Sequence, residues 1–196
     1  LGLAQRGNGE LRAALASFAV ARPFAEAAGN RALGAELHAN RGNVLSDLGE
    51  LEAAIDEYQL AVQGYRAAGN KRGEGQALSY IGSVWAVLGE QSRALAAFEP
   101  ALAALRSIGH SYQAVVLHRM GTAHHELRQL AAAADDFTAA LEIWRAHHLR
   151  WGEAMALAEL GGGKVRLVAD PVFAGAAGGL AIALDADESD WEKLQA

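Results

Sequence analysis

The chain has 196 residues, of which 52% are hydrophobic and 20% charged, a balance typical of a folded protein rather than a disordered one. It contains no cysteine, which excludes disulfides, thiol catalysis and cysteine-ligated zinc sites. The formal net charge of −6 is a poor electrostatic match for nucleic acid, and no apolar run approaches the roughly 20 residues of a membrane-spanning helix. We therefore expect a cytoplasmic protein that binds neither nucleic acid nor membrane.

The sequence repeats with a period of about forty residues. Glycines recur at spacings of 40, 40, 39 and 40 residues, at Gly2, Gly42, Gly82, Gly121 and Gly161. One aromatic and two alanine columns keep the same register: Phe18, Tyr58, Phe98 and Phe137; Ala14, Ala54, Ala94 and Ala133; Ala21, Ala61, Ala101 and Ala140. Several columns in one register over four periods predict a structural repeat.

Each period predicts two helices. In the second helix of the second period, Leu51, Ile55, Tyr58 and Val62 follow the spacing of one helical face. Glycine pairs such as Gly49-Glu50 end the helices, because glycine adopts the left-handed conformation at little cost. In chain order the expected helices are the end of a first helix at 1–8 and its partner 11–28, then 35–48 with 51–68, 72–88 with 91–108, 111–127 with 130–147, and a lone helix at 151–160.

This pattern resembles the tetratricopeptide repeat, whose small, aromatic and alanine positions fall on Gly42, Ala54, Tyr58 and Ala61 and on their equivalents. A forty-residue unit resembles the longer variety found in bacterial STAND and antibiotic-pathway transcription regulators. The resemblance implies an all-α fold, an α-solenoid of hairpins in a right-handed superhelix, with about four repeats and a C-terminal capping segment. The expected array spans 1–160, with hairpins at 1–28, 31–68, 72–108 and 111–147 and a further first helix at 151–160.

Four residues depart from the repeat pattern. Arg128 and His148 stand where glycine ends the other helices. A left-handed residue with a side chain costs about 1–2 kcal/mol, so we expect these two turns to differ from the rest. Pro23 and Pro100 fall in the middle of expected helices, where proline removes a hydrogen bond and clashes one turn back. We expect a tolerated bend at each proline rather than a hinge.

The period stops after Gly161. Residues 172–184 are compatible with one short alanine-rich helix, and the spacing of Ser189 and Glu192 predicts a helix start there. Residues 161–196 are therefore either a divergent cap over the last repeat or a flexible tail. We favour the cap, because repeat arrays need their ends covered.

Histidines are the only candidates for chemistry in this sequence. His118, His124 and His125 share one expected helix, but Glu126 points about 100° away from His125 and completes no ligand spacing. No Ser-His-Asp arrangement can be recognised from spacing either. We therefore expect no catalytic residue, no metal, no cofactor and no enzymatic activity.

The resemblance implies a concave surface, lined by the first helix of each hairpin, in which a partner lies. Carrying the family's groove positions over to 35–48, 72–88 and 111–127 gives three helical faces of mostly small or polar residues. Such side chains leave room for a ligand backbone, although a solvated groove without a partner would look alike. The candidate groove residues are Asn43, Ser46 and Asp47, then Gln76, Ser79 and Ser83, then His118, Thr122, His125 and Glu126, flanked by Ala39, Ala86 and Val115.

Two functional hypotheses follow. The leading one is a protein-interaction scaffold that binds a protein or peptide in the groove, as part of a larger bacterial regulatory protein; the start at Leu1 without methionine also favours a part of something longer. The alternative is a sensor domain in which a small effector or signalling peptide changes the curvature of the array. An enclosed apolar pocket would favour the small effector, and an open polar groove the protein partner. Self-association through the ends of the array is a further route to a partner.

Overall fold

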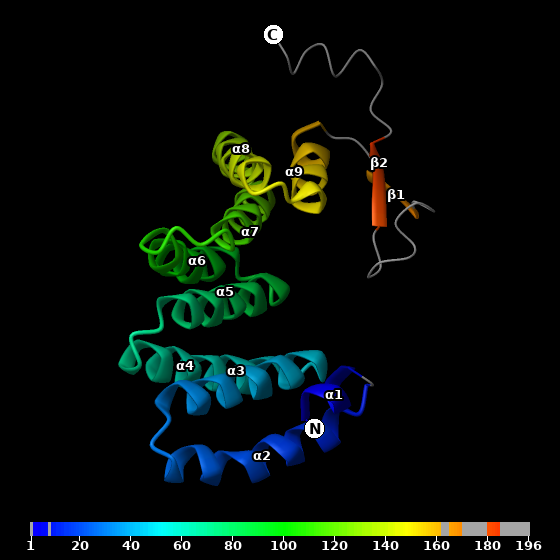
Figure 1. The fold of residues 1–196 in the computed structure, drawn as a ribbon. Coiled ribbons are helices and arrows are strands. Elements are labelled where there is room, and N and C mark those ends of the chain that lie inside the picture. The colour runs from blue at the N-terminus through cyan, green and yellow to red at the C-terminus, as the bar shows by residue number, and fades with distance from the viewer. Residues whose placement is uncertain (1, 8, 162–164, 170–179, 185–196) are drawn as a thin grey trace.

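The computed structural model describes residues 2–7, 9–161, 165–169 and 180–184. In this part of the chain, α-helices joined by short turns stack in chain order, each packed mainly on its neighbours in sequence (Figure 1). This arrangement confirms the predicted all-α solenoid. The helices are α1 (Gly2–Gly7), α2 (Leu11–Ala27), α3 (Arg31–Asp47), α4 (Leu51–Ala67), α5 (Lys71–Val87), α6 (Gln91–Arg106), α7 (Gln113–Glu126), α8 (Leu130–Ala146) and α9 (Arg150–Gly161).

The helix boundaries follow local capping chemistry. Helix α3 begins at Arg31, four residues before the predicted start at 35, because the side chain of Asn30 accepts a hydrogen bond from the Leu33 amide at 3.0 Å. Asn70 caps α5 in the same way through the Gly73 amide at 2.9 Å. No helix in the described ranges is long and apolar enough to cross a bilayer.

The glycine and aromatic columns of the repeat meet inside each hairpin. A Cβ atom placed on Gly42 would lie 2.6 Å from Cε1 of Tyr58, and one on Gly121 would lie 2.7 Å from Cε1 of Phe137. A glycine inside a helix costs about 1 kcal/mol relative to alanine. The aromatic ring occupies the space that a side chain would need, so the close approach compensates for that cost.

A second set of glycines joins consecutive hairpins, a feature that the sequence analysis missed. A Cβ atom on Gly73 of α5 would lie 2.5 Å from Cδ1 of Tyr65 of α4. One on Gly152 of α9 would overlap the ring of Trp144 of α8. Aromatic side chains near the end of one hairpin therefore pack on glycines near the start of the next.

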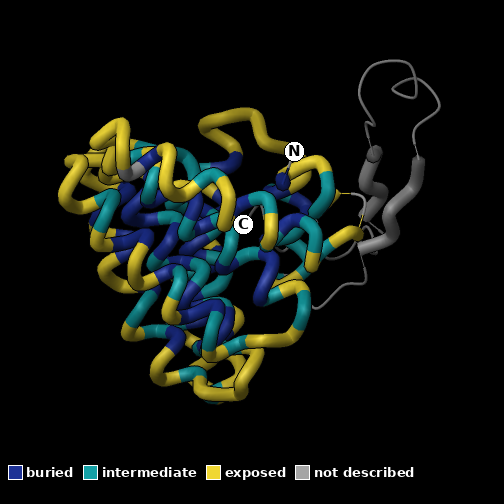
Figure 2. The backbone as a smooth tube through the Cα atoms, turned by 90° about the horizontal axis from the view of Figure 1, so that it is seen from below, coloured by how far each residue is buried: buried dark blue, intermediate teal, exposed yellow. Residues whose placement is uncertain are grey.

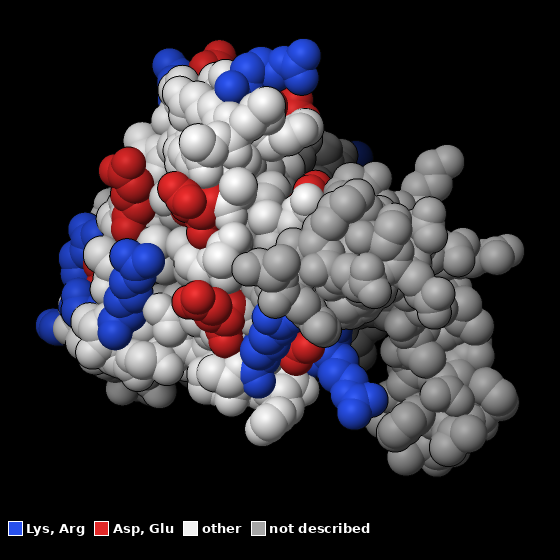
Figure 3. Space-filling view, turned by 90° about the horizontal axis from the view of Figure 1, so that it is seen from above, with Lys and Arg blue, Asp and Glu red and all other residues white. Residues whose placement is uncertain are grey.

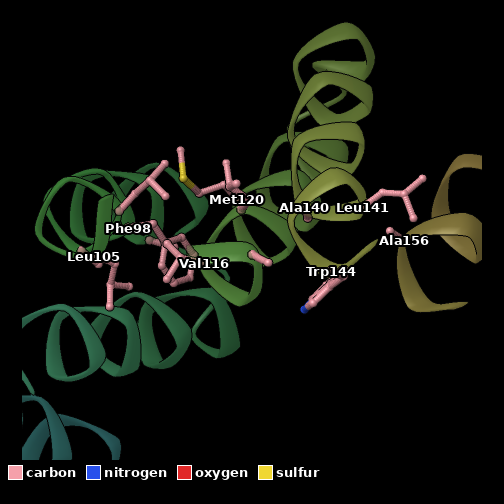
Figure 4. Close-up of a cluster of buried hydrophobic side chains, with 13 residues drawn as sticks. Phe98, Leu105, Val116, Met120, Ala140, Leu141, Trp144 and Ala156 are labelled. Carbon is pink, nitrogen blue, oxygen red and sulfur yellow. The ribbon is translucent and has the colours of Figure 1, made fainter. Parts of the chain in front are cut away.

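The buried residues run along the inside of the stack and leave the turns exposed (Figure 2). Around α6 to α9 they form a continuous cluster that includes Phe98 and Leu105 of α6, Val116 of α7, Leu141 and Trp144 of α8 and Ala156 of α9 (Figure 4). Phe98 is 1% exposed and Leu105 is fully buried. Each buried cluster among the described residues includes side chains from more than one hairpin, so the hairpins depend on their neighbours for burial.

The two turns without glycine adopt the same conformation as the others, so the expectation that they differ is wrong. Arg128 has a φ of 62° and His148 a φ of 55°, against 60° to 79° at the glycines that end the earlier helices. The reason is the hydrogen bonding that follows. The Gln129 amide donates to the His124 carbonyl at 2.9 Å, as the Glu50 amide does to Leu45.

Both prolines lie inside continuous helices. Helix α2 runs through Pro23 and α6 runs through Pro100, and both residues are exposed. An exposed proline leaves the freed carbonyl open to water, which lowers the cost of the lost hydrogen bond. A bend at each position stays a prediction.

The array is followed by two strands, β1 (Val165–Ala169) and β2 (Leu180–Leu184), which pair antiparallel with Val165 opposite Leu184 and contact α9. The predicted helix over 172–184 is therefore wrong at 180–184. The alternation of Leu180, Ile182 and Leu184 suits a strand, and pairing with a distant segment overrides the helix propensity of alanine. Residues 172–179 and 189–192 lie outside the described residues, and the choice between cap and tail stays open.

Candidate partner-binding groove

Two neighbouring hollows lie on the face formed by α1, α3, α5 and α7. The larger has a volume of about 410 Å³ and the smaller about 180 Å³. They share Asn43 and Tyr80, so we treat them as one first-helix groove. The larger is lined by Glu36, Ala39, Asn40, Asn43, Tyr65, Asn70, Arg72, Gly73, Gln76, Ala77 and Tyr80. The smaller is lined by Arg6, Asn43, Ser46, Asp47, Tyr58, Tyr80, Ser83, Val84, Val87 and Arg119.

The predicted groove residues of α3 and α5 reach these hollows, with one exception. Asn43, Ser46, Asp47, Gln76 and Ser83 line them, whereas Ser79 is fully buried. Several of these polar groups already have partners. Asn43 accepts a hydrogen bond from the Tyr58 hydroxyl at 2.8 Å, and the Ser83 hydroxyl donates to the Ser79 carbonyl at 2.9 Å.

The predicted groove residues of α7 line neither hollow. The ring of His118 packs on Phe137 and Trp144, with centroid distances of 5.3 and 5.7 Å. The Thr122 hydroxyl donates to the carbonyl of His118 at 3.1 Å. His125 and Glu126 are exposed at the end of the helix. Partner binding by these four residues stays a prediction, but the structure does not bring them to the groove.

His118 is held as a neutral ring. Its Nε2 atom is buried and has no hydrogen-bond partner among the described residues. Burial lowers the pKa of His118; the negative charge of Glu159 opposes this shift only in part, and the positive charge of Arg119 adds to it. An imidazole in this environment resists protonation.

Tyrosine rings form the floor between the hollows. The rings of Tyr58 and Tyr80 lie 5.3 Å apart at a tilt of 37°. Burial raises the pKa of Tyr58 and the pKa of Tyr80, so both phenols stay protonated, and the Tyr58 hydroxyl donates to Asn43. Tyrosine rings combine an apolar face with a polar hydroxyl, and such side chains are enriched at protein interfaces.

Two arginines stand at the smaller hollow with different partners. Arg6 forms an ion pair with Asp47, with 2.6 Å between Nε and Oδ2, and this hydrogen bond raises the pKa of Arg6. Arg119 instead donates from Nη1 to the Ser79 hydroxyl at 2.7 Å and to the Tyr112 hydroxyl at 3.4 Å. One arginine is neutralised by a carboxylate, and the other is held by neutral oxygens.

Comparison with known proteins bears on the fold. Residues 35–63 match the tetratricopeptide repeat family model. The structure of BtubC from P. vanneervenii is similar, with a TM-score of 0.75 and 16% identity over 83% of this chain and 68% of that one. Apo RapI aligns at a TM-score of 0.74, and a Rap protein complexed with competence and sporulation factor at 0.66. Each is 17% identical over 82% of this chain and 45% of its own.

The chain has the tetratricopeptide-repeat fold. It spans less than half the length of the two Rap structures. No match to a curated protein was found.

Three of the groove residues that the sequence analysis missed share one repeat column. Asn40, Tyr80 and Arg119 are 40 and 39 residues apart, so they are equivalent positions of the tetratricopeptide repeat. This spacing was available from the sequence and would have placed all three beside the Asn43 column. No comparable spacing predicts the contact between Arg6 and Asp47, which joins the separate helices α1 and α3.

Other charged clusters of this tetratricopeptide array stabilise hairpins away from the groove. Burial opposes ionisation of Glu57, but hydrogen bonds with His38 at 2.7 Å and Arg41 at 3.0 Å outweigh it and lower the pKa of Glu57.

No group of three metal-ligating side chains occurs among the described residues. Acidic and basic side chains are interspersed on the face that Figure 3 shows, rather than gathered into a field of one sign.

Proposed function

We propose that the first-helix groove binds a protein or peptide partner and that the chain is an interaction scaffold. The observation that supports this most directly is the larger hollow, where the side-chain amides of Asn40, Asn43 and Gln76 line a space between α3 and α5. An amide side chain offers both a donor and an acceptor. This pairing suits the alternating N–H and C=O groups of an extended peptide backbone.

The character of the hollow favours a polypeptide over a small effector. Most of the side chains that line the larger hollow are polar, and the hollow lies on the surface between helices. A small-molecule site is usually enclosed and mainly apolar. A Rap protein of similar fold has been solved in complex with competence and sporulation factor, so the fold accommodates a bound factor in that protein.

The same proposal includes the kind of protein to which this chain belongs. The forty-residue repeat unit and the alanine-rich composition support a place in a larger bacterial regulatory protein that acts in the cytoplasm. In that setting the array would recruit a partner, and neighbouring domains would supply the response.

The proposal can be tested with two alanine substitutions in the larger hollow. Asn40 and Gln76 make no side-chain hydrogen bond within the described residues, so Asn40→Ala with Gln76→Ala removes groove amides without breaking an internal contact. Asn43 is less suitable, because its loss would leave the Tyr58 hydroxyl without its acceptor. The matched control is Gln59→Ala with Gln63→Ala, which removes two exposed amides from α4.

Binders selected from a phage-displayed random peptide library against the natural chain supply the probe. We expect the groove variant to bind them about 10-fold more weakly or worse, because each lost hydrogen bond contributes about 0.5–1.5 kcal/mol. The α4 control should keep its affinity. A library that yields no binder, or binders with equal affinity for the groove variant and the control in isothermal titration, would contradict the proposal.

A further inference from the structure

The charge at the smaller hollow indicates what kind of partner the groove prefers. We infer that Arg119 receives the carboxylate of an acidic side chain of the partner, so that the scaffold selects segments containing Asp or Glu. The inference rests on the proposed function of the groove and specifies the chemistry of its partner.

Arg119 is partly buried, whereas Arg31, Arg72 and Arg150 of the other first helices are exposed to water. Arg6, Arg41 and Arg66 each form an ion pair with a carboxylate. Arg119 forms none within the part of the chain that the structure describes, although it is partly buried. A partly desolvated charge without a counter-ion is costly, and a carboxylate arriving from outside would relieve that cost.

The guanidinium group is held ready for such a contact. Its two hydrogen bonds both leave from Nη1, so Nε and Nη2 have no partner among the described residues. These two nitrogens form one edge of the planar group and present parallel N–H bonds, which is the geometry that binds a carboxylate with both oxygens. The partner would therefore meet a receptor whose orientation is already set.

The anchor for this orientation is a buried hydroxyl. Ser79 is fully buried, and its Oγ accepts the Arg119 hydrogen bond at 2.7 Å. The equivalent positions in the neighbouring repeats are Ala39 and His118. Of these three residues, only Ser79 of α5, which contacts Arg119 of α7, carries a hydroxyl. A serine buried in this way has a clear role as the acceptor that fixes the guanidinium.

The opposite side of the smaller hollow offers no competing cation. Arg6 lines the same hollow, but Asp47 neutralises it. Val87, which is 73% exposed, adds an aliphatic surface beside Arg119. A segment that runs along the groove from the larger hollow, which the exposed Arg72 lines, would thus meet at Arg119 a partly buried guanidinium next to an apolar contact. It would meet this group with a side chain rather than with its end.

The test compares peptides that differ by one charge. Library peptides displayed at the N-terminus of the phage protein have no free carboxyl terminus, and we expect the peptides selected by the 196-residue chain to be enriched in Asp and Glu. The best of them is then synthesised with an amidated C-terminus, in its natural form and with Glu or Asp changed to Gln or Asn. This neutral version should bind the natural protein at least 10-fold more weakly.

The protein side of the comparison uses Arg119→Gln. This variant should bind both peptides with affinities within 2-fold of each other, because the charge that distinguishes them is gone. Arg12→Gln, which removes an exposed charge from α2, should keep the 10-fold preference. Arg119→Lys keeps the charge without the planar fork, and it should show an intermediate preference even if the glutamine variant does not fold.

Several outcomes would overturn the inference. Selected peptides without acidic enrichment, or an acid preference that persists in Arg119→Gln, would show that Arg119 does not bind an acidic side chain. The groove proposal would still hold in that case if binding continues to depend on Asn40 and Gln76. If tight binding required a free C-terminal carboxylate on the peptide, the group that Arg119 binds would be the end of the chain and not an acidic side chain. A library that yields no binder would end both proposals.

Discussion

The middle of the array and its C-terminal end share one backbone repeat but use it differently. In α3 and α5, polar side chains of the first helices reach the hollows. In α7 the predicted residues do not reach the hollows, because His118 packs on Phe137 and Trp144 while Thr122, His125 and Glu126 are exposed elsewhere. The repeat therefore sets where each helix lies, whereas the residue at each column decides whether that column forms a binding surface or part of the core.

One column shows this clearly. Ala39, Ser79 and His118 are equivalent positions on three successive first helices. The first lines the larger hollow, the second is buried and holds Arg119, and the third packs among aromatic rings. A small residue leaves a hollow beside it, a hydroxyl recruits a donor, and a ring fills the space, so equal backbone positions give three different environments.

The largest effect should come from filling a close approach in the middle of the array. Any Cβ atom on Gly82 would overlap the ring of Phe98. Gly82→Val should lower the free energy of unfolding by about 2–3 kcal/mol, because overpacking outweighs the few tenths gained in helix propensity. Urea denaturation followed by circular dichroism measures this change.

The matched control for that substitution is Gly34→Ala. Gly34 also lies inside a helix, but a Cβ atom there would meet nothing within 4 Å. This variant should be more stable than the natural chain by up to about 1 kcal/mol. A destabilised Gly34→Ala, or an unaffected Gly82→Val, would show that the glycine column is not maintained by ring packing.

A second, smaller effect concerns the C-terminal end of the array, where His118 should make the free energy of unfolding depend on pH. Burial lowers the pKa of His118 in the folded state, so below about pH 6.5 the unfolded chain binds a proton that the folded chain refuses. Stability should therefore fall as the pH drops below that value, with a slope of at most about 1.4 kcal/mol per pH unit from this residue.

His118→Phe should remove that part of the pH dependence. The comparison is the free energy of unfolding at pH 7.5 and pH 5.5 for both chains, where phenylalanine keeps the ring but cannot be protonated. An identical difference between the two pH values in both proteins would show that His118 is not protected from protonation.

The smallest effect should come from the turn between α7 and α8. Arg128 has a φ of 62°, a conformation that glycine adopts without the penalty of a side chain. Arg128→Gly should therefore raise the free energy of unfolding by about 1 kcal/mol, detectable as a higher midpoint in thermal denaturation. The same change at the exposed Arg12, in the first turn of α2, should not raise the free energy of unfolding, because no left-handed conformation is relieved there.

Much of the fold could be predicted from the sequence because it depends on local spacing. The columns at Gly42 and Tyr58, and their equivalents, define the helices and the contact within each hairpin, since residues on one helical face recur at fixed intervals. The same argument placed Asn43 and Gln76 on the face that lines the groove. It failed at 180–184, where a partner strand rather than local propensity sets the conformation.

The amino-acid order alone determined the helices and their pairing, and it placed the groove residues of α3 and α5 but not those of α7. Only the tertiary structure decided which polar groups remain free. Arg119 finds Ser79 forty residues away and Arg6 finds Asp47 forty-one residues away. A long side chain can reach acceptors on more than one neighbouring helix. Which acceptor it binds depends on the distances between the helices, and residue spacing along a single helix does not specify those distances.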